Sequence, residues 1–512
     1  MNALLFGAGG VYLLATAALF AFGANFIYYS ALAWRGGREP EPSKAMSCPL
    51  PKVTVQLPIY NELYVSARVI EAACLLDYPK DLLQIQVLDD STDETVAVVA
   101  EAVKRAQSRG TNIVHVRRAD RSGFKAGALR NGLETATGEF VAIFDADFVP
   151  NPDFLLRAMP HFDSADVAFV QARWGHLNRD YSWLTKLQAM AIDAHFTVEQ
   201  YGRGLRGYWF NFNGTAGIWR RAAIEDAGGW TADTLTEDLD LSYRAHLNGW
   251  QGRYLIDLVA PAELPAHFAG FRRQQHRWAR GSLECAIKLL PRVWRSSASL
   301  GVKVQASAHL LGYTVHLLLF VVTLIYPFVV ALSVGYASLS TLFGLAYLFA
   351  LTSLAPAIFF VTGQRQLGER WWRTLPRVIL VAVLGSGLML NTARAAVQIV
   401  SRSQTEFERT AKFGIDEDSD GSTNWKRQRY QLRLDRIVYM EAALGAYGLA
   451  TAWFAFTTQT WGIMLYAGLF GLGLLAVATA SLVESVGVFR NRLARTEQIQ
   501  KEQTRWATAN AE

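Results

Sequence analysis

The stretch EFVAIFDADF, residues 139–148, decides the fold that the sequence predicts. An apolar run of strand-forming residues ends in two carboxylates, Asp145 and Asp147, separated only by Ala146. Side chains two residues apart on a strand point the same way, so both carboxylates can reach one hard cation. The alternative is that the two acids only cap the turn that follows.

Four further stretches have the character of strands: KVTVQLP (52–58), LQIQVLDD (83–90), NIVHVRR (112–118) and DVAFVQARW (166–174). Each is short, rich in Val, Ile or Phe, and bounded by polar or turn residues. Their near-continuous apolarity predicts a mainly parallel, doubly wound sheet buried on both faces, in which ligands bind beyond the carboxyl ends of the strands. Neither GxGxxG after the first strand nor GxxxxGK[ST] is present, which disfavours a dinucleotide fold and a P-loop ATPase.

The composition indicates a membrane protein. Of 512 residues, 51% are hydrophobic and only 18% are charged, so several membrane spans are expected. The net charge of +6 comes from basic residues that cluster beside apolar runs, without a nucleic-acid motif, and no nucleic-acid partner is predicted. Cys48, Cys74 and Cys285 are far apart and support neither a disulfide framework nor a zinc site.

Apolar runs long enough to span occur at 6–34, 306–335, 338–362, 377–400, 437–458 and 462–488. The run 377–400 carries Asn391 and Arg394, which suits a helix in the membrane interface better than one facing lipid. An interfacial helix there leaves every basic loop on the cytoplasmic side, with the N-terminus outside and the C-terminus inside. We therefore expect five spans, against an alternative of six.

Paired acids recur along the chain. In QVLDDSTDET, Asp89 and Asp90 end a buried strand; Asp93 is the expected helix cap, and Asp90 is free to accept from a base or ribose. In LTEDLDL, Thr236 is the expected N-cap, followed by Glu237, Asp238 and Asp240 in the first helical turn. Acids in this place can simply complement the helix dipole, but one of them can also serve as a general base.

These parts suit one type of reaction. A metal at an Asp pair, cations near it and a single base fit the attack of a hydroxyl on a carbon that carries a diphosphate leaving group. A single displacement needs only one base and inverts the configuration at that carbon.

FRRQQHRWARGS, residues 271–282, surrounds Trp278 with cations. Such a stretch can be a membrane-surface belt, or a binding site in which arginines hold phosphate and the Trp offers a flat face to a ring. The ordered acids upstream favour the binding site, with the outer residues Arg272, Arg273 and Arg280 left to serve the membrane surface.

The ordered set of Asp90, DAD at 145–147, TED at 236–238 and QxxRW at 274–278 resembles the membrane-embedded family 2 glycosyltransferases, which include cellulose, chitin and hyaluronan synthases. PIYNE, QVLDDSTD, KAGAL, FNGTAGIWR and QQHRW are similar to plant cellulose-synthase-like A and C proteins, which make β-mannan or glucomannan and the β-1,4-glucan backbone of xyloglucan. The similarity is dense over residues 50–285. It implies an α/β glycosyltransferase-A (Rossmann-like) cytosolic domain inserted in an α-helical transmembrane bundle.

The resulting domain plan is a multi-pass protein, expected in the plasma (inner) membrane with its catalytic domain in the cytoplasm. Its predicted segments are a transmembrane helix at 1–35, the catalytic domain at 50–300, two transmembrane helices at 301–365, an interfacial helix and cytoplasmic loop at 366–436, two transmembrane helices at 437–490, and a cytoplasmic tail at 491–512.

The resemblance also implies roles for single residues. Asp238 is the implied catalytic base, and Asp145 and Asp147 are the implied ligands of Mg²⁺ or Mn²⁺. Nucleotide-sugar binding is implied for Tyr60, Glu62, Asp90, Lys125, Asp145, Asp147, Gln274 and Arg277. Acceptor binding is implied for Trp278, Phe212, Asn213, Gly214, Thr215 and Glu237. The alternatives are that Tyr60 and Trp278 are core aromatics and that Lys125 is a solvated helix charge.

A further match is partial. FERTAK, residues 407–412, resembles the F-x-V-T-x-K gating loop of cellulose synthases through Phe407, Thr410 and Lys412, but Arg409 stands in place of the Val. A plain cytoplasmic linker is the alternative.

The expected function is inverting, processive transfer of hexose from UDP-glucose or GDP-mannose to a β-linked, β-1,4 polysaccharide, with translocation across the membrane. AHLNGW, residues 245–250, leans toward the glucan makers. The alternatives are a single-transfer lipid glucosyltransferase of the ceramide type and an inactive nucleotide-sugar sensor or transport component. The expected partners are a nucleotide sugar, a glycan acceptor and membrane lipids, whereas the sequence does not indicate whether accessory subunits exist.

Overall fold

The computed structural model describes residues 2–37, 50–336, 351–403, 409–416, 425, 430 and 434–509, without the side chains of 2, 351 and 490–509. Cys48 and the predicted gating residue Phe407 lie outside this range.

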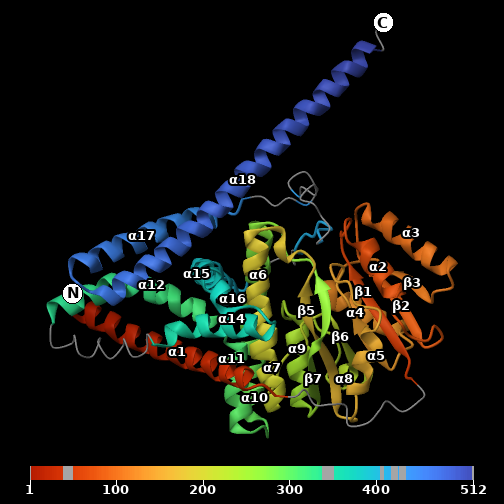
Figure 1. Ribbon diagram of the computed structural model, residues 1–512, viewed down its shortest axis with the longest axis horizontal. Coiled ribbons are helices and arrows are strands. Elements are labelled where there is room, and N and C mark those ends of the chain that lie inside the picture. Colours follow the sequence, from red (N-terminus) through yellow and green to blue (C-terminus); the bar gives the residue numbers. More distant parts are fainter. Residues whose placement is uncertain are drawn as a thin grey trace.

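Seven strands form one sheet in the order β3-β2-β1-β4-β6-β5-β7 (Figure 1). They are β1 (Val53–Ile59), β2 (Leu83–Asp89), β3 (Ile113–Arg117), β4 (Phe140–Ile143), β5 (Val167–His176), β6 (Gly217–Arg220) and β7 (Gln251–Ala262). The half from β3 to β4 is parallel, as predicted, but β6 runs antiparallel to both β4 and β5. The sheet is therefore mixed. The sequence did not predict β6, which is only four residues long, or β7, whose exposed and buried positions do not form one apolar run.

Helices cover both faces of the sheet, so β2 is buried throughout and β1 is buried except at Pro58. One face packs against α2 (Ser66–Cys74), α3 (Thr95–Ser108) and α5 (Phe154–Ala158). The other face packs against α4 (Phe124–Thr135), α8 (Arg221–Asp226) and α9 (Glu237–Leu247). The second core also contains Tyr29 and Leu32, from the end of the first apolar helix, so the two parts of the molecule share one hydrophobic core.

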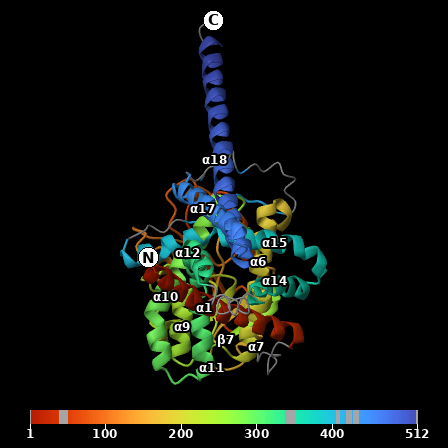
Figure 2. The same ribbon diagram turned by 90° about the vertical axis from the view of Figure 1, so that its left-hand side faces the viewer.

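Most of the remaining helices form a bundle beside the sheet, and the others connect this bundle to the sheet (Figures 1 and 2). The bundle helices are α1 (Asn2–Arg35), α12 (Thr314–Gly335), α14 (Ala355–Gln366), α15 (Trp371–Gly387), α16 (Met389–Val400), α17 (Ile437–Thr457) and α18 (Trp461–Ala509), whose far end projects away from the rest. The connecting elements are α6 (Trp183–Ala194), the π-helix η3 (His195–Gln200), α7 (Tyr201–Arg206), α10 (Phe268–Arg295) and α11 (Leu300–Leu310). Short 3₁₀ turns are η1 (Met159–His161), η2 (Arg179–Tyr181) and η5 (Leu351–Leu354).

In the described part of the chain, four helices are long and apolar enough to cross a membrane: Ala3–Arg35, Thr314–Gly335, Trp371–Val400 and Trp461–Phe489. The third of these includes the segment predicted to lie in the interface, while α17, a predicted span, is not among the four. Part of the predicted span 338–362 lies outside the described residues. The arrangement of five spans therefore stays a prediction.

Candidate active site

A pocket opens at the carboxyl ends of the parallel strands, where such sheets bind ligands. Its free volume is about 180 Å³. It is lined by most of the predicted site residues: Tyr60, Glu62, Asp90, Lys125, Asp145, Asp147, Asn213, Gly214, Glu237, Asp238, Gln274, Arg277, Trp278, Thr410 and Lys412. The structure thus brings together residues that are spread over more than half of the chain, and their roles stay predictions.

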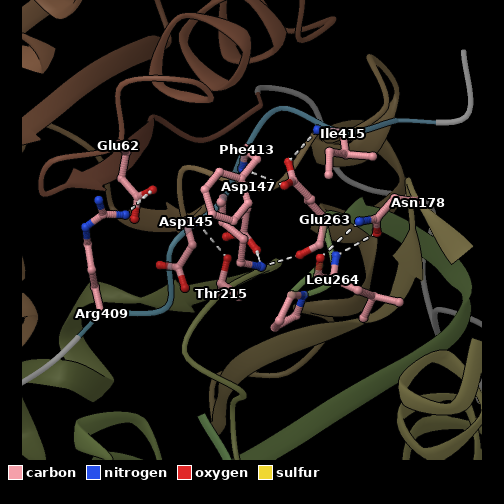
Figure 3. A network of polar contacts seen from close by, with 12 residues as sticks. Glu62, Asp145, Asp147, Asn178, Thr215, Glu263, Leu264, Arg409, Phe413 and Ile415 are labelled. Carbon is pink, nitrogen blue, oxygen red and sulfur yellow. Dashed lines mark hydrogen bonds and ion pairs between the residues drawn. The ribbon is translucent and has the colours of Figure 1, made fainter. Parts of the chain in front are cut away.

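The two aspartates of the DAD motif lie just after β4 and face the pocket (Figure 3). The strand ends at Ile143, so both residues stand in a turn, and the expected alternation along a strand is not what aligns them. Both form ion pairs with lysines: Lys125 Nζ lies 2.5 Å from Asp145 Oδ1, and Lys412 Nζ contacts Asp147 Oδ2. Because both carboxylates contact lysine ammonium groups, they do more than cap the turn.

The DAD turn is suited to a divalent cation. Within the residues that the structure describes, no cluster of three or more His, Cys, Asp or Glu side chains could hold a metal. Burial and the neighbouring Asp147 raise the pKa of Asp145, so a nearby cation would stabilise its charged form. Asp145 and Asp147 therefore fit a hard cation as its two protein ligands, if diphosphate oxygens supply other ligands.

Asp238, the predicted base, is the second residue of α9. Thr236 stands at the N-cap position as predicted, but its side chain makes no capping hydrogen bond, and its hydroxyl lies 3.5 Å from Cys285 Sγ. The FNGT loop reaches Asp238 through Gly214, where an added Cβ would come within 2.9 Å of Asp238 Oδ2. Since Gly214 also has a φ of +80°, only glycine suits this position.

We expect the activity of the free enzyme to depend on the protonation of Asp238. Burial and the adjacent Glu237 raise the pKa of Asp238 to about 7. A base must be deprotonated to act, so kcat/KM should fall as the pH drops below about 7 and level off above it. The pH dependence of kcat/KM for sugar transfer measures this directly, and an unchanged value down to about pH 5 would contradict it.

The pocket lining also includes Tyr60, Glu62 and Asp90, the residues predicted to lie around the nucleoside. The expectation that the Asp90 carboxylate is free is wrong. Arg118 Nε lies 2.9 Å from Asp90 Oδ1, and Arg118 Nη2 contacts Asp90 Oδ2. The Arg121 guanidinium lies over the Tyr60 ring, 3.3 Å from its centroid. These two arginines were missed because their partners lie about thirty residues or more away along the chain. The prediction of Asp93 as the helix cap is wrong by one residue, because Glu94 stands at the N-cap of α3 and makes no side-chain capping hydrogen bond. Asp93 lies just before it, and its Oδ1 accepts from Thr95 N at 3.0 Å.

Helix α10 carries the QxxRW residues into the pocket. The ring of Trp278 lies beside that of Trp174, at 6.5 Å between centroids, and both line the cavity. Trp174, at the end of the β5 strand, was not predicted as a site residue. The expectation that Arg272 and Arg280 serve the membrane surface is wrong, because both are buried. Arg272 Nη2 lies 2.8 Å from Glu441 Oε1 of α17, so its charge is paired inside the protein.

The FNGT loop divides between the pocket and the core. Asn213 and Gly214 line the cavity, whereas Phe212 is fully buried against Phe169 and Trp219 and does not reach it. Thr215 lies beneath the site, where its hydroxyl accepts from Asp145 N at 2.8 Å. The loop is thus held by core packing at one end and by the DAD turn at the other.

The segment 409–416 contributes Arg409, Thr410 and Lys412 to the lining of the pocket. Arg409, the departure from the gating-loop pattern, has a partner here: its Nη1 lies 3.1 Å from Glu62 Oε2. Glu263, one residue past β7, accepts hydrogen bonds from backbone amides of the same segment. The sequence signal for Glu263 was a lone acid in the apolar stretch PAELP, and it was missed.

The mixed sheet, with its DAD turn and cavity at the strand ends, defines a domain of the glycosyltransferase-A type. Residues 51–281 match the family described as Glycosyltransferase like family 2. This part of the chain is a family 2 glycosyltransferase domain, which confirms the resemblance.

Two plant relatives illustrate the similarity. Glucomannan 4-beta-mannosyltransferase 2 of Arabidopsis thaliana is 49% identical over 251 residues, which are 48% of this chain and 47% of that relative. Glucomannan 4-beta-mannosyltransferase 1 of Oryza sativa subsp. japonica is 45% identical over 251 residues, 48% of each protein. The chain spans about half the length of the curated relatives it matches.

A solved structure shares the fold. The mannosyltransferase PcManGT of Pyrobaculum calidifontis, solved in complex with GDP-Man and Mn²⁺, has a TM-score of 0.51 and 20% sequence identity. The similarity covers 78% of this chain and 100% of that one.

Proposed function

We propose that this protein is an inverting hexosyltransferase that adds mannosyl units from GDP-mannose to the end of a β-1,4-linked glycan. The observation that carries the proposal is the meeting of the DAD carboxylates, Lys125 and Asp238 in one pocket of a family 2 domain. The names of the plant relatives favour mannose over the glucose suggested by AHLNGW. UDP-glucose remains the competing donor.

The proposed reaction is a single displacement. The Asp238 carboxylate takes the proton of an acceptor hydroxyl, whose oxygen then forms a bond to C1 of the donor sugar. The bond from C1 to the diphosphate oxygen breaks, its electron pair leaves with the nucleoside diphosphate, and the configuration at C1 is inverted. Trp278 and Trp174 would offer flat apolar faces to the terminal sugar of the acceptor.

Lys125 would remain charged beside the leaving diphosphate. Burial alone would lower the pKa of Lys125, but the carboxylates of Asp145 and Glu237 outweigh it and raise that pKa. Its Nζ also donates to Gly214 O at 3.0 Å, so the ammonium is held between the DAD turn and the acceptor loop. A divalent cation held by Asp145 and Asp147 would further stabilise the negative charge on the diphosphate.

Removal of divalent cations should therefore suppress transfer. We expect an excess of EDTA to lower the rate by about 10²-fold or more, since a metal contributes several kcal/mol to stabilising such charge. Adding back Mn²⁺ or Mg²⁺ should restore the rate. Full activity in EDTA would show that Lys125 and the arginines suffice without a metal.

The choice of donor is tested by supplying purified protein in lipid with either GDP-mannose or UDP-glucose and measuring the released nucleoside diphosphate. The proposal predicts that GDP is released from GDP-mannose in the presence of a glycan acceptor. Release of UDP alone would assign the chain to glucan synthesis. Release of neither would favour an inactive nucleotide-sugar sensor or transport component.

The proposal includes extension of a polymer at the membrane. It is supported by α10, which carries Trp278 and also packs on the bundle: Asn391 Nδ2 of α16 donates to Arg272 O at 3.0 Å. Glu484 of α18 accepts from Phe268 N and Ala269 N at the first turn of α10. The predicted acceptor end of the pocket is therefore attached directly to the apolar helices through which the product would leave.

A further inference from the structure

Glu263 connects the segment 412–415 to the sheet. It lies one residue past the end of β7, and its side chain is completely buried. We propose that Glu263 is a positioning residue that seats this segment over the donor pocket, so that Lys412 stands at the DAD turn. The consequence for donor binding rests on the proposed function, whereas the seat itself does not.

The carboxylate of Glu263 accepts hydrogen bonds from three consecutive backbone amides (Figure 3). Phe413 N lies 2.7 Å from Oε1, and Gly414 N and Ile415 N lie 3.0 and 3.1 Å from Oε2. Successive amides that converge on one anion form a nest, which requires a left-handed residue. Gly414 meets this need with a φ of +73°.

The same residue is tied to the candidate metal site. Glu263 N donates to Asp147 O at 3.1 Å, while Lys412 Nζ contacts both Glu263 O and Asp147 Oδ2. On its other side, Arg68 Nη2 lies 3.1 Å from Glu263 Oε2 and balances its charge. One buried carboxylate therefore fixes the backbone of the segment and, through it, the place of the Lys412 ammonium.

Apolar packing holds the segment in the same region but does not set its register. The Phe413 ring packs against His267 and Trp425, at 5.4 and 6.1 Å between centroids. Ring contacts of this kind tolerate sliding, whereas three charge-assisted hydrogen bonds to one carboxylate are directional. The amide nest is thus the feature that determines how far Lys412 reaches into the pocket.

The seat also explains the size of the cavity. Its volume of about 180 Å³ lies below the roughly 300 to 1,000 Å³ usual for ligand sites, and Arg409, Thr410 and Lys412 are part of its wall. A nucleotide sugar would have to displace the Lys412 ammonium from Asp147, and its diphosphate offers that ammonium a new anionic partner. Glu263 would hold the backbone in place during this exchange.

Hydrogen exchange tests the seat without any donor. In Glu263→Gln, the side chain keeps its size but loses its charge and one acceptor oxygen, so amide exchange at Phe413, Gly414 and Ile415 should accelerate about tenfold or more. Asp193→Asn is the matched control, because Asp193 is a similarly buried acid whose partners His176, Arg179 and Gln364 do not belong to the segment. Exchange at 413–415 should be unchanged in this control.

Kinetics test what the seat does. Glu263→Gln should raise the KM for the donor about tenfold with a smaller change in kcat, and Glu263→Asp, which keeps the charge, should recover part of the loss. Unchanged exchange at 413–415 in Glu263→Gln would overturn the seat. Equal acceleration of exchange at 413–415 in Asp193→Asn would show that the loss of any buried charge loosens the segment, and this too would contradict a specific role of Glu263. Faster exchange with an unchanged donor KM would refute its role in binding. If no donor is turned over at all, the exchange result still decides whether the seat exists.

Discussion

Replacing Asp238 by Asn should lower the rate of sugar transfer by about 10²- to 10⁴-fold, the range that a general base contributes. The side chain would keep its size and its place against Gly214, but it could no longer take the proton of the acceptor hydroxyl. Donor affinity should stay within a few fold, because the donor contacts proposed here come from other residues. Transfer rates and calorimetric titration with GDP-mannose measure the two effects separately.

Asp240→Asn provides the matched control, two residues further along α9. Asp240 is buried, and its carboxylate lies 2.8 Å from Arg244 Nε and 2.7 Å from Lys288 Nζ. Removing its charge should lower the melting temperature more than the rate per folded molecule. If Asp238→Asn retained full transfer, or if both variants lost rate only in proportion to folded protein, Asp238 would not be the base.

Replacing Trp278 by Ala should lower the rate of elongation by about 10- to 100-fold while donor binding is kept. The indole lies beside Trp174 in the pocket wall, and its loss removes a flat apolar face on which the acceptor sugar would rest. A misplaced acceptor hydroxyl reacts slowly even when donor and base are intact.

The test compares initial rates and product lengths with donor affinity. Trp294→Ala is the control on the same helix, because Trp294 is 49% exposed and lies outside the pocket. This control should leave product length unchanged. Equal losses of donor binding and elongation in Trp278→Ala would indicate that Trp278 serves the structure of α10 and not the acceptor.

The sequence predicted those parts of the fold whose signal is local. β1, β2, β4 and β5 follow from apolar runs, and the acids at 89–90 and 145–147 follow from where the runs of β2 and β4 end. β6 escaped because four residues carry too little pattern, and its pairing with β4 and β5 depends on packing that only the folded chain provides.

The candidate site shows the same division. Its acids and the QxxRW residues could be named from short motifs, but their partners could not. Glu62 meets Arg409 across 347 positions of sequence, and Arg272 meets Glu441 across 169. Such pairs form through tertiary packing, which cannot be predicted from the spacing of residues along the chain. For this reason the sequence showed Arg409 only as a departure from the gating-loop pattern, and it predicted Arg272 to lie at the membrane surface.

Transfer of mannose with inversion onto a growing β-glycan can be tested by incubating proteoliposomes that contain the full chain with radiolabelled GDP-mannose and Mn²⁺, and then digesting the product with an endo-β-1,4-mannanase. We expect a labelled polymer that the mannanase degrades to short oligosaccharides. A single labelled sugar on a lipid, or a product that only α-mannosidases hydrolyse, would contradict the proposed synthesis of a β-glycan.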